Sequence, residues 1–174
     1  MSGVVIWFTG LSGAGKSTIA ELVGRELEAE GALVEYLDGD VVRERLSKGL
    51  GFSKQDRDTN IERIGWVAAR LARHGATVIV SAISPYAEAR ATARALVEEF
   101  APFVEVHVAT SVEECARRDV KGLYAKAFSG EVAGFTGVSD PYEAPESPEL
   151  RLDTEGCTPD DCAREVLHLL TVTV

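Results

Sequence analysis

The residues from Gly10 to Ser17 combine a flexible, glycine-rich backbone with a lysine and a following serine in a spacing suited to binding phosphate. Their sequence, Gly-Leu-Ser-Gly-Ala-Gly-Lys-Ser, fits G-x-x-x-x-G-K-[ST], the phosphate-binding loop of nucleotide-dependent enzymes. Glycines let successive backbone N–H groups curl around phosphate oxygens without a Cβ clash. Lys16 can reach the β- and γ-phosphates of a nucleotide, and the Ser17 hydroxyl can bind the accompanying Mg²⁺. An ordinary glycine-rich turn between a strand and a helix is the alternative.

The residues on either side of this loop predict the strand and the helix that such a loop requires. The apolar run from Val4 to Phe8 is typical of a buried parallel strand. After the loop, apolar residues recur at helical spacing, and Gly31 is a natural stop for that helix. The helix adds the positive end of its dipole to the phosphate site. This strand–loop–helix context favours nucleotide binding over a plain turn.

The rest of the chain alternates between predicted strands and helices, which is the pattern of a parallel sheet covered on both faces. We expect further strands at residues 33–37, 77–81, 103–108 and 150–152, and further helices at 41–46, 56–74, 87–100, 112–118 and from Pro159 onward. The prediction is therefore an α/β, P-loop NTPase-type, three-layer fold with a mostly parallel five-stranded sheet, in a single domain over residues 1–174. Ligands of such sheets bind beyond the carboxyl ends of the strands. The phosphate loop, Asp38-Gly39-Asp40, Ser81–Pro85 and the start of 109–118 should therefore meet at one rim.

Composition and charge exclude several partners. A formal net charge of −10 argues against nucleic acid and anionic membranes, and no apolar run approaches the roughly 20 residues that span a bilayer. Met1-Ser2-Gly3 leads directly into the first strand, so we expect no signal or transit peptide and a cytoplasmic protein. The three cysteines lack metal-ligand spacing and are expected to be free thiols, although a redox pair of Cys157 and Cys162 stays open.

Residues 119–148 are punctuated by glycine, proline and aromatic residues, and begin within a basic stretch, Arg117–Lys126, of an otherwise acidic chain. A long irregular segment in a compact domain is usually a functional lid or binding loop. We expect a mobile lid at about residues 117–148. Its positive charge is suited to an anionic ligand, although a solvated helix face is the alternative. The small size and the absence of guanine-binding and switch motifs favour a small-molecule kinase, which needs a lid to exclude water.

Further motifs accompany the phosphate loop: Leu37-Asp38-Gly39-Asp40 with Arg43, Leu50-Gly51-Phe52-Ser53, Asp56-Arg57 with Asn60-Ile61, Ile83-Ser84-Pro85-Tyr86, Arg118–Tyr124, Gly134-Phe135-Thr136-Gly137 and Tyr142-Glu143-Ala144-Pro145. In this combination the chain resembles the adenylylsulfate kinase (APS kinase) family, from Trp7 to the terminal helix. Members of that family use ATP to phosphorylate the ribose 3′-hydroxyl of adenosine 5′-phosphosulfate in sulfate activation. The resemblance implies the same reaction here, with ATP and Mg²⁺, and a homodimer.

The resemblance also implies site residues. ATP is expected at Gly10, Ser12, Gly13, Ala14, Gly15, Lys16, Ser17, Thr18, Arg118 and Cys157, with Ser17 on the metal. Adenosine 5′-phosphosulfate is expected at Asp40, Arg43, Phe52, Arg57, Asn60, Ile83, Ser84, Lys121, Gly134 and Phe135, with the phenylalanines on either side of the adenine. Lys16, Asp38, Asp40 and Ser84 are the candidate catalytic residues.

Two of these assignments stay open at the level of sequence. Asp38 or Asp40 can orient or deprotonate the 3′-hydroxyl, or hold Mg²⁺ through water; a simple turn is the alternative for this pair. The family has been described with a phosphoserine at the position of Ser84. No base in the sequence is evidently placed to activate that hydroxyl, so we expect direct transfer. A kinase for another small alcohol and a non-catalytic nucleotide sensor are the competing functions.

Overall fold

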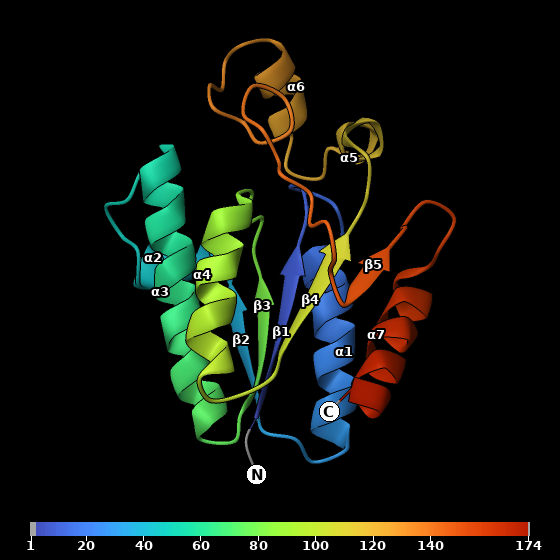
Figure 1. Cartoon of the computed structure of the whole chain (residues 1–174). Coiled ribbons are helices and arrows are strands. Elements are labelled where there is room, and N and C mark those ends of the chain that lie inside the picture. The colour runs from blue at the N-terminus through green and yellow to red at the C-terminus, as the bar shows by residue number, and fades with distance from the viewer. Residues whose placement is uncertain (1–2, 174) are drawn as a thin grey trace.

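A five-stranded sheet forms the centre of the computed structural model, which describes residues 3–173 (Figure 1). The strand order is β2-β3-β1-β4-β5, and all the pairings between these neighbours are parallel. The strands are β1 (Val4–Thr9), β2 (Val34–Asp38), β3 (Thr77–Ser81), β4 (Phe103–Val108) and β5 (Leu150–Leu152). The α/β fold with a five-stranded sheet, predicted from the alternating pattern, is confirmed.

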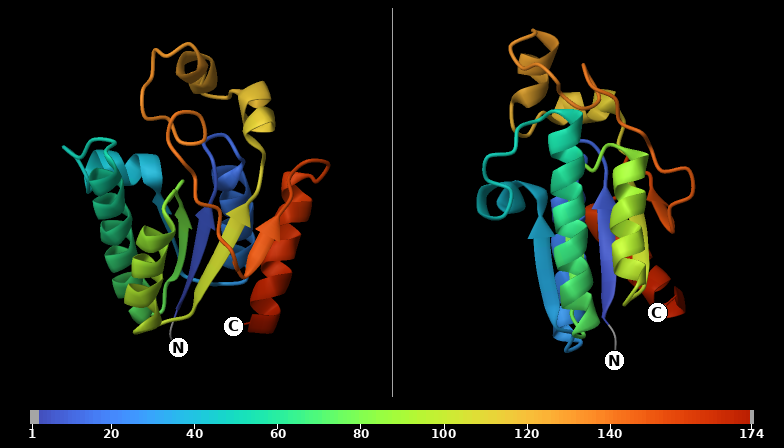
Figure 2. Two further views of the ribbon diagram at one scale, coloured as in Figure 1. Left: turned by 45° about the horizontal axis from the view of Figure 1, so that its top comes forward. Right: turned by 60° about the vertical axis from the view of Figure 1, so that its left-hand side comes forward.

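Helices cover both faces of the sheet and produce three layers (Figure 2). One face carries α1 (Lys16–Ala29) and α7 (Pro159–Thr173), and the other carries α3 (Lys54–Arg73) and α4 (Ala87–Glu98). Throughout the described residues, 3–173, no helix has both the length and the apolar character that crossing a membrane requires.

The central strand β1 supplies both halves of the core. Ile6 and Phe8 pack against the α1 and α7 side, whereas Val5 and Trp7 pack against the α3 and α4 side. All four side chains are fully buried, which explains why this strand reads as a continuous apolar run instead of an alternating one. Thus β1 is held from both faces, and the phosphate loop starts at its fixed carboxyl end.

Close helix packing depends on a glycine in α3. A Cβ at Gly65 would lie 2.8 Å from the Cα of Ala93 in α4, a distance that real Cβ atoms essentially never show. Only a residue without a side chain allows α3 and α4 to approach this closely.

Three short helices, α2 (Gly39–Arg45), α5 (Val112–Arg118) and α6 (Leu123–Phe128), lie toward the carboxyl ends of the strands (Figures 1 and 2). The prediction of an irregular segment over 119–148 was wrong for α6. That helix has only six residues, and it starts after Gly122, which adopts a left-handed φ of 65°. A helix so short leaves little periodicity in the sequence.

Candidate active site

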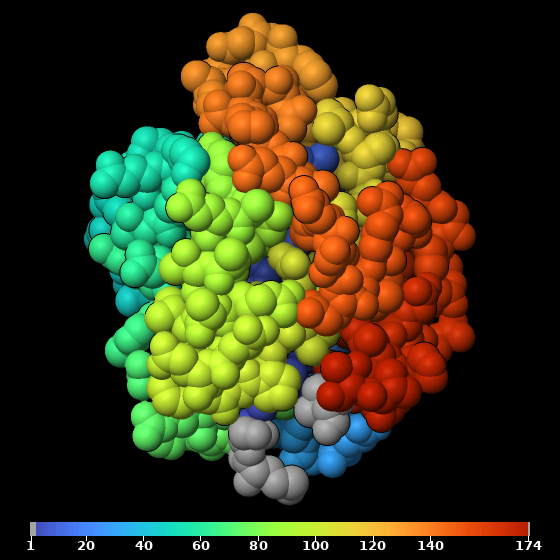
Figure 3. Space-filling view, in the orientation of Figure 1, coloured from blue at the N-terminus to red at the C-terminus, as the bar shows by residue number. Residues whose placement is uncertain are grey.

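A cleft of about 610 Å³ lies at the carboxyl edge of the sheet, where the predicted rim should be. Its walls come from the phosphate loop, the β2–α2 junction, the start of α3, the β3–α4 loop and the segment that contains α6. In Figure 3 the chain after α6 (orange) descends across the front of the molecule, between α4 and the β5–α7 region. The cleft thus brings together residues that are far apart in the sequence.

The phosphate loop turns as its glycines permit. Gly13 and Gly15 have φ values of 73° and 103°, which side-chain-bearing residues rarely adopt. Lys16 is only 8% exposed, and its ammonium donates to the carbonyls of Gly10 and Leu11 at 3.0 and 2.8 Å. Burial lowers the pKa of Lys16 from 10.5 to about 8. The loop therefore holds a buried cation beside its own curled backbone.

Oxygen atoms from the ends of two strands, β2 and β3, lie beside Ser17. The Ser17 hydroxyl donates to Oδ2 of Asp38 at 3.1 Å and lies 3.1 Å from the Ser81 hydroxyl. The other carboxylate oxygen of Asp38 accepts the backbone N–H groups of Asp40 and Val41 and so caps α2. Asp38 is thus fixed in position by the helix that follows it. Ser81 belongs to the segment Ser81–Pro85 that was predicted at this rim, although it was not named among the binding or catalytic residues.

This donor set suits Mg²⁺, which prefers hard oxygen ligands and keeps several of its own waters. Within residues 3–173, no group of three or more His, Cys, Asp or Glu side chains is arranged to hold a metal ion. Any Mg²⁺ in this cleft would therefore rely on Ser17 and Asp38 together with water and phosphate oxygens, not on a cage of protein ligands.

The second aspartate of the pair points to a different partner. Asp40 forms an ion pair with Lys121 at 2.5 Å, and both side chains are more than half exposed. Lys121 precedes α6, so this pair connects the candidate lid to α2. A further contact comes from Tyr124 in α6, whose hydroxyl donates to the carbonyl of Ser12 at 2.7 Å. The basic segment therefore faces the cleft.

Two predicted aromatic contacts line the cleft on different segments. Phe52 precedes α3 and is 67% exposed, with the Arg43 guanidinium 4.5 Å from its ring centroid. Arg43 also donates to the carbonyl of Gly51 at 3.0 Å. Phe135 packs edge-on against Tyr124, with 5.0 Å between ring centroids. An exposed aromatic ring at a cleft is available for stacking on a planar ligand.

Arg57 and Asn60, both on α3, lie at the base of the cleft. Arg57 is 7% exposed and donates to Thr136 at 2.8 Å and to the carbonyl of Gly134, and it pairs with Asp140 at 3.1 Å. Its guanidinium therefore fixes residues 134–140 against α3, a contact that sequence reasoning missed. The Oδ1 atom of Asn60 is buried without a hydrogen-bond partner within residues 3–173. A buried amide oxygen beside a cleft is suited to accept from a ligand.

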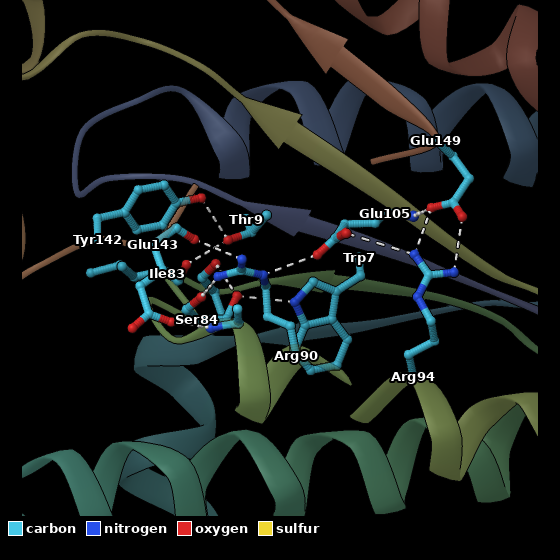
Figure 4. A network of polar contacts seen from close by, with 12 residues as sticks. Trp7, Thr9, Ile83, Ser84, Arg90, Arg94, Glu105, Tyr142, Glu143 and Glu149 are labelled. Carbon is cyan, nitrogen blue, oxygen red and sulfur yellow. Dashed lines mark hydrogen bonds and ion pairs between the residues drawn. The ribbon is translucent and has the colours of Figure 1, made fainter. Parts of the chain in front are cut away.

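The β3–α4 loop brings Ile83 and Ser84 to the same cleft (Figure 4). Ser84 is 2% exposed, and its hydroxyl accepts from the indole N–H of Trp7 at 3.0 Å and donates to the Ala82 carbonyl at 3.2 Å. The carbonyl of Ile83 accepts from the hydroxyl of Thr9 at 2.7 Å. The Ser84 hydroxyl therefore has partners on both its donor and its acceptor side.

Most predicted site residues line this cleft, and four do not. Those that line it are Ser12, Gly13, Gly15, Lys16, Ser17, Thr18, Asp38, Asp40, Arg43, Phe52, Arg57, Asn60, Ile83, Ser84, Lys121, Gly134 and Phe135. Gly10 and Ala14 belong to the phosphate loop but lie behind its surface, and the carbonyl of Ala14 accepts from Thr110. Cys157 packs against the core on the α1 and α7 side.

Arg118, the fourth of these residues, pairs with Glu114 one turn earlier in α5 at 2.7 Å. Arg117 binds the same carboxylate, and the hydrogen bonds from Arg117 and then Arg118 lower the pKa of Glu114 to about 2. Arg117, like Arg118, therefore has a partner within its own helix. The roles of Arg118 and Cys157 at ATP stay predictions.

Comparison with known proteins identifies the family. A family model described as adenylylsulphate kinase matches residues 2–153. The chain is 56% identical over 171 residues to an adenylyl-sulfate kinase of Deinococcus deserti, which covers 98% of this chain and 93% of the relative. An adenylyl-sulfate kinase of Picosynechococcus is 53% identical over 97% of this chain and 94% of its own length. Among solved structures, the APS kinase CysC of Mycobacterium tuberculosis in complex with AMPPNP and APS superposes with a TM-score of 0.94 at 47% identity, over 98% of both chains.

Proposed function

We propose a role for each group of residues in the cleft, because this chain belongs to the adenylylsulfate kinase family. The protein is an ATP-dependent adenylyl-sulfate kinase of sulfate activation. It transfers the γ-phosphoryl group of ATP to the ribose 3′-hydroxyl of adenosine 5′-phosphosulfate, which gives 3′-phosphoadenosine 5′-phosphosulfate and ADP. Both substrates are anionic, so catalysis consists mainly of positioning and charge stabilisation.

The phosphate loop holds ATP. Backbone N–H groups around Gly13 and Gly15 surround the phosphate oxygens, and the Lys16 ammonium exchanges the loop carbonyls for the β- and γ-phosphates. Ser17 and Asp38, whose side chains lie 3.1 Å apart, are the residues that would hold Mg²⁺, directly or through water. When bound there, the metal would supply positive charge beside the phosphate oxygens.

Asp40 orients the acceptor hydroxyl. The Asp38 carboxylate already accepts hydrogen bonds from the start of α2 and from Ser17. The Asp40 carboxylate, in contrast, forms an exposed ion pair with Lys121. A carboxylate in this position can accept the hydrogen of the 3′-hydroxyl, and Lys121 beside it can stabilise the transferring phosphoryl group. The closeness of Asp40 and Lys121, from distant segments, supports this assignment.

The acceptor nucleotide lies between Phe52 and Phe135, where its adenine stacks. Arg43, Arg57 and Asn60 provide donors and an acceptor for its ribose and phosphosulfate. Stacking does not distinguish one base from another, so polar groups of the cleft must recognise adenine.

Phosphoryl transfer is direct, and Ser84 does not carry the phosphoryl group. Nucleophilic attack would require a base to take the Ser84 hydrogen, and that hydrogen is directed at the Ala82 carbonyl, which is not a base. In this proposal Ile83 and Ser84 contact the acceptor through a loop that is fixed from behind.

We infer one kinase domain over residues 1–174, in which residues 117–148 form a mobile lid that closes to exclude water from the γ-phosphate. A homodimer follows from the family resemblance, and free thiols at Cys115, Cys157 and Cys162 are consistent with a reducing cytoplasm.

The observation that carries the proposed function is the convergence of the phosphate loop, the Asp38–Asp40 pair and two aromatic rings on one cleft. A coupled ADP-release assay with adenylyl sulfate, AMP and gluconate as acceptors tests it, with Lys16→Ala as the inactive control. Turnover should occur with adenylyl sulfate and not with gluconate. Turnover with gluconate alone would indicate another small-alcohol kinase, and binding without turnover at any Mg·ATP concentration would indicate a nucleotide sensor.

A further inference from the structure

The loop from Ala82 to Pro85 lines the cleft and contains a strained residue. Ser84 has a φ of 44°, in the left-handed region that residues with a side chain rarely adopt. Such a conformation persists where surrounding contacts fix it, and it concentrates at binding sites. The contacts that hold Ser84 therefore also set the positions that Ile83 and Ser84 present to a ligand.

Arg90, in the first half of α4, holds this loop from behind (Figure 4). Its Nη1 donates to the carbonyl of Ser84 at 2.7 Å, and its Nε donates to the Glu105 carboxylate at 3.1 Å. Arg90 is only 4% exposed, so Glu105 compensates a charge that water does not reach. A charge-assisted hydrogen bond from a buried guanidinium is stronger than one between neutral groups.

The same guanidinium also binds Glu143, which together with Tyr142 forms the segment, named here the strap, at which the candidate lid returns to the body. Nη2 of Arg90 donates to the Glu143 carbonyl at 2.7 Å. The backbone N–H of Glu143 donates to the carbonyl of Pro85 at 2.8 Å, and the Tyr142 hydroxyl lies 2.9 Å from that of Thr9. Figure 4 shows strap and loop on either side of the guanidinium.

We propose that Arg90 is a positioning residue that joins the loop Ala82–Pro85 to the strap. It thereby fixes the position of the acceptor side of the cleft relative to the end of the candidate lid. The proposal rests on the proposed function, because it assigns Arg90 an effect on adenylyl sulfate and not on ATP. The hydrogen bonds of its guanidinium go to Ser84, Glu105 and Glu143, none of which belongs to the phosphate loop.

A lysine cannot replace this arginine in the proposed role. The planar guanidinium directs its donors to three separate acceptors at once, whereas an ammonium is a single point charge on a flexible stem. In Arg90→Lys the charge beside Glu105 remains, and the bridge between the Ser84 and Glu143 carbonyls is lost. The left-handed conformation of Ser84 then loses one of its main supports, and the acceptor loop relaxes.

Arg94 provides a matched control, because it lies one turn further along α4 among the same carboxylates. It pairs with Glu149 at 2.8 Å and lies 3.7 Å from Glu105, and its hydrogen bonds reach neither the loop nor the strap. In Arg90→Lys the KM for adenylyl sulfate should rise by about tenfold or more, with the KM for ATP within about twofold. Arg94→Lys should leave both KM values within about twofold.

The comparison is designed so that a purely structural effect is recognised. If the KM for ATP rises with that for adenylyl sulfate, if neither rises, or if Arg94→Lys behaves like Arg90→Lys, the proposal is wrong. Should Arg90→Lys not fold, Tyr142→Phe decides, because it removes only the hydroxyl contact between strap and Thr9. It should raise the KM for adenylyl sulfate alone by about threefold, and an unchanged KM overturns the proposal. Turnover of the unmodified chain is measured first, so a failure of the proposed function appears there.

Discussion

Replacing Lys16 by methionine should abolish catalysis and yet stabilise the protein near neutral pH. The ammonium of Lys16 is buried, and burial lowers its pKa from 10.5 to about 8. This difference corresponds to about 3 kcal/mol by which the charged side chain disfavours folding below pH 8, at about 1.4 kcal/mol per pH unit. Methionine has a similar length and carries no charge.

The stability gained by removing this buried charge is partly offset by the loss of two hydrogen bonds. The Lys16 ammonium donates to the carbonyls of Gly10 and Leu11, and each net hydrogen bond contributes about 1 kcal/mol. The Lys16→Met chain should therefore be more stable than the unmodified chain by about 1 kcal/mol near pH 7. It should have lost most of its kinase activity, since no cation then reaches the phosphates.

The pH dependence gives the sharper test. Between about pH 8 and 10.5 the unfolded chain holds a proton on Lys16 that the folded chain has released, so the stability contributed by this residue rises with pH in that window. The methionine variant lacks this contribution. The difference in unfolding free energy between the Lys16→Met chain and the unmodified chain should therefore fall by about 2 kcal/mol between pH 7 and 9.5 and change sign.

Urea denaturation without nucleotide, at one fixed protein concentration, measures this difference. All other groups titrate in both chains, so their effects cancel in the comparison, and Lys48→Met provides a control at an exposed lysine. If the unfolding free energies of the unmodified and Lys16→Met chains change in parallel over this pH range, burial does not destabilise the Lys16 ammonium and the reasoning is refuted.

Three further predictions concern stacking, helix packing and the route of transfer. Phe52→Ala should raise the KM for adenylyl sulfate about tenfold or more, since base stacking contributes roughly 1–3 kcal/mol, while the KM for ATP stays constant; an unchanged KM in steady-state assays would remove the stacking role. Gly65→Ala should lower the unfolding free energy by about 1–3 kcal/mol in urea titrations, because its Cβ would meet Ala93 at 2.8 Å. The control Glu62→Ala, on the exposed side of α3, should leave the unfolding free energy unchanged. Incubation with γ-labelled ATP should leave no label on Ser84 that adenylyl sulfate can chase, and recovery of such a label by mass spectrometry would contradict direct transfer.

Continuous apolar runs and capping residues made much of the fold predictable. The strands at 77–81, 103–108 and 150–152 and the helix at 112–118 have the predicted bounds. Ser111 caps the helix at 112–118 by accepting from the backbone N–H of Glu114. Serine is a preferred residue at this position, so it predicts where the helix starts. The strand predicted at 33–37 is shifted by one residue, since Asp38 ends β2 while also capping α2.

The location of the cleft was also predictable, because parallel strands place their carboxyl ends at one edge. The partners of its polar side chains were not. Arg57 binds Thr136 and Asp140, about 80 positions further along the chain, and no local pattern encodes a contact over such a separation. The same holds for Lys121 with Asp40. Sequence patterns therefore indicate which residues reach the rim, and only packing decides what each of them touches.

Ser84 illustrates why this distinction matters for mechanism. A serine before a proline at a strand end, in a kinase motif, can be interpreted as a nucleophile. In the fold its hydroxyl is buried, accepts from Trp7 and donates to a carbonyl, while its backbone has a left-handed φ and its carbonyl accepts from Arg90. A hydroxyl that attacks phosphorus must be free to move and must lose its hydrogen to a base, and the partners of the Ser84 hydroxyl favour neither, which supports the proposed direct transfer. In the proposed mechanism the serine therefore supports the loop that presents the acceptor nucleotide to ATP.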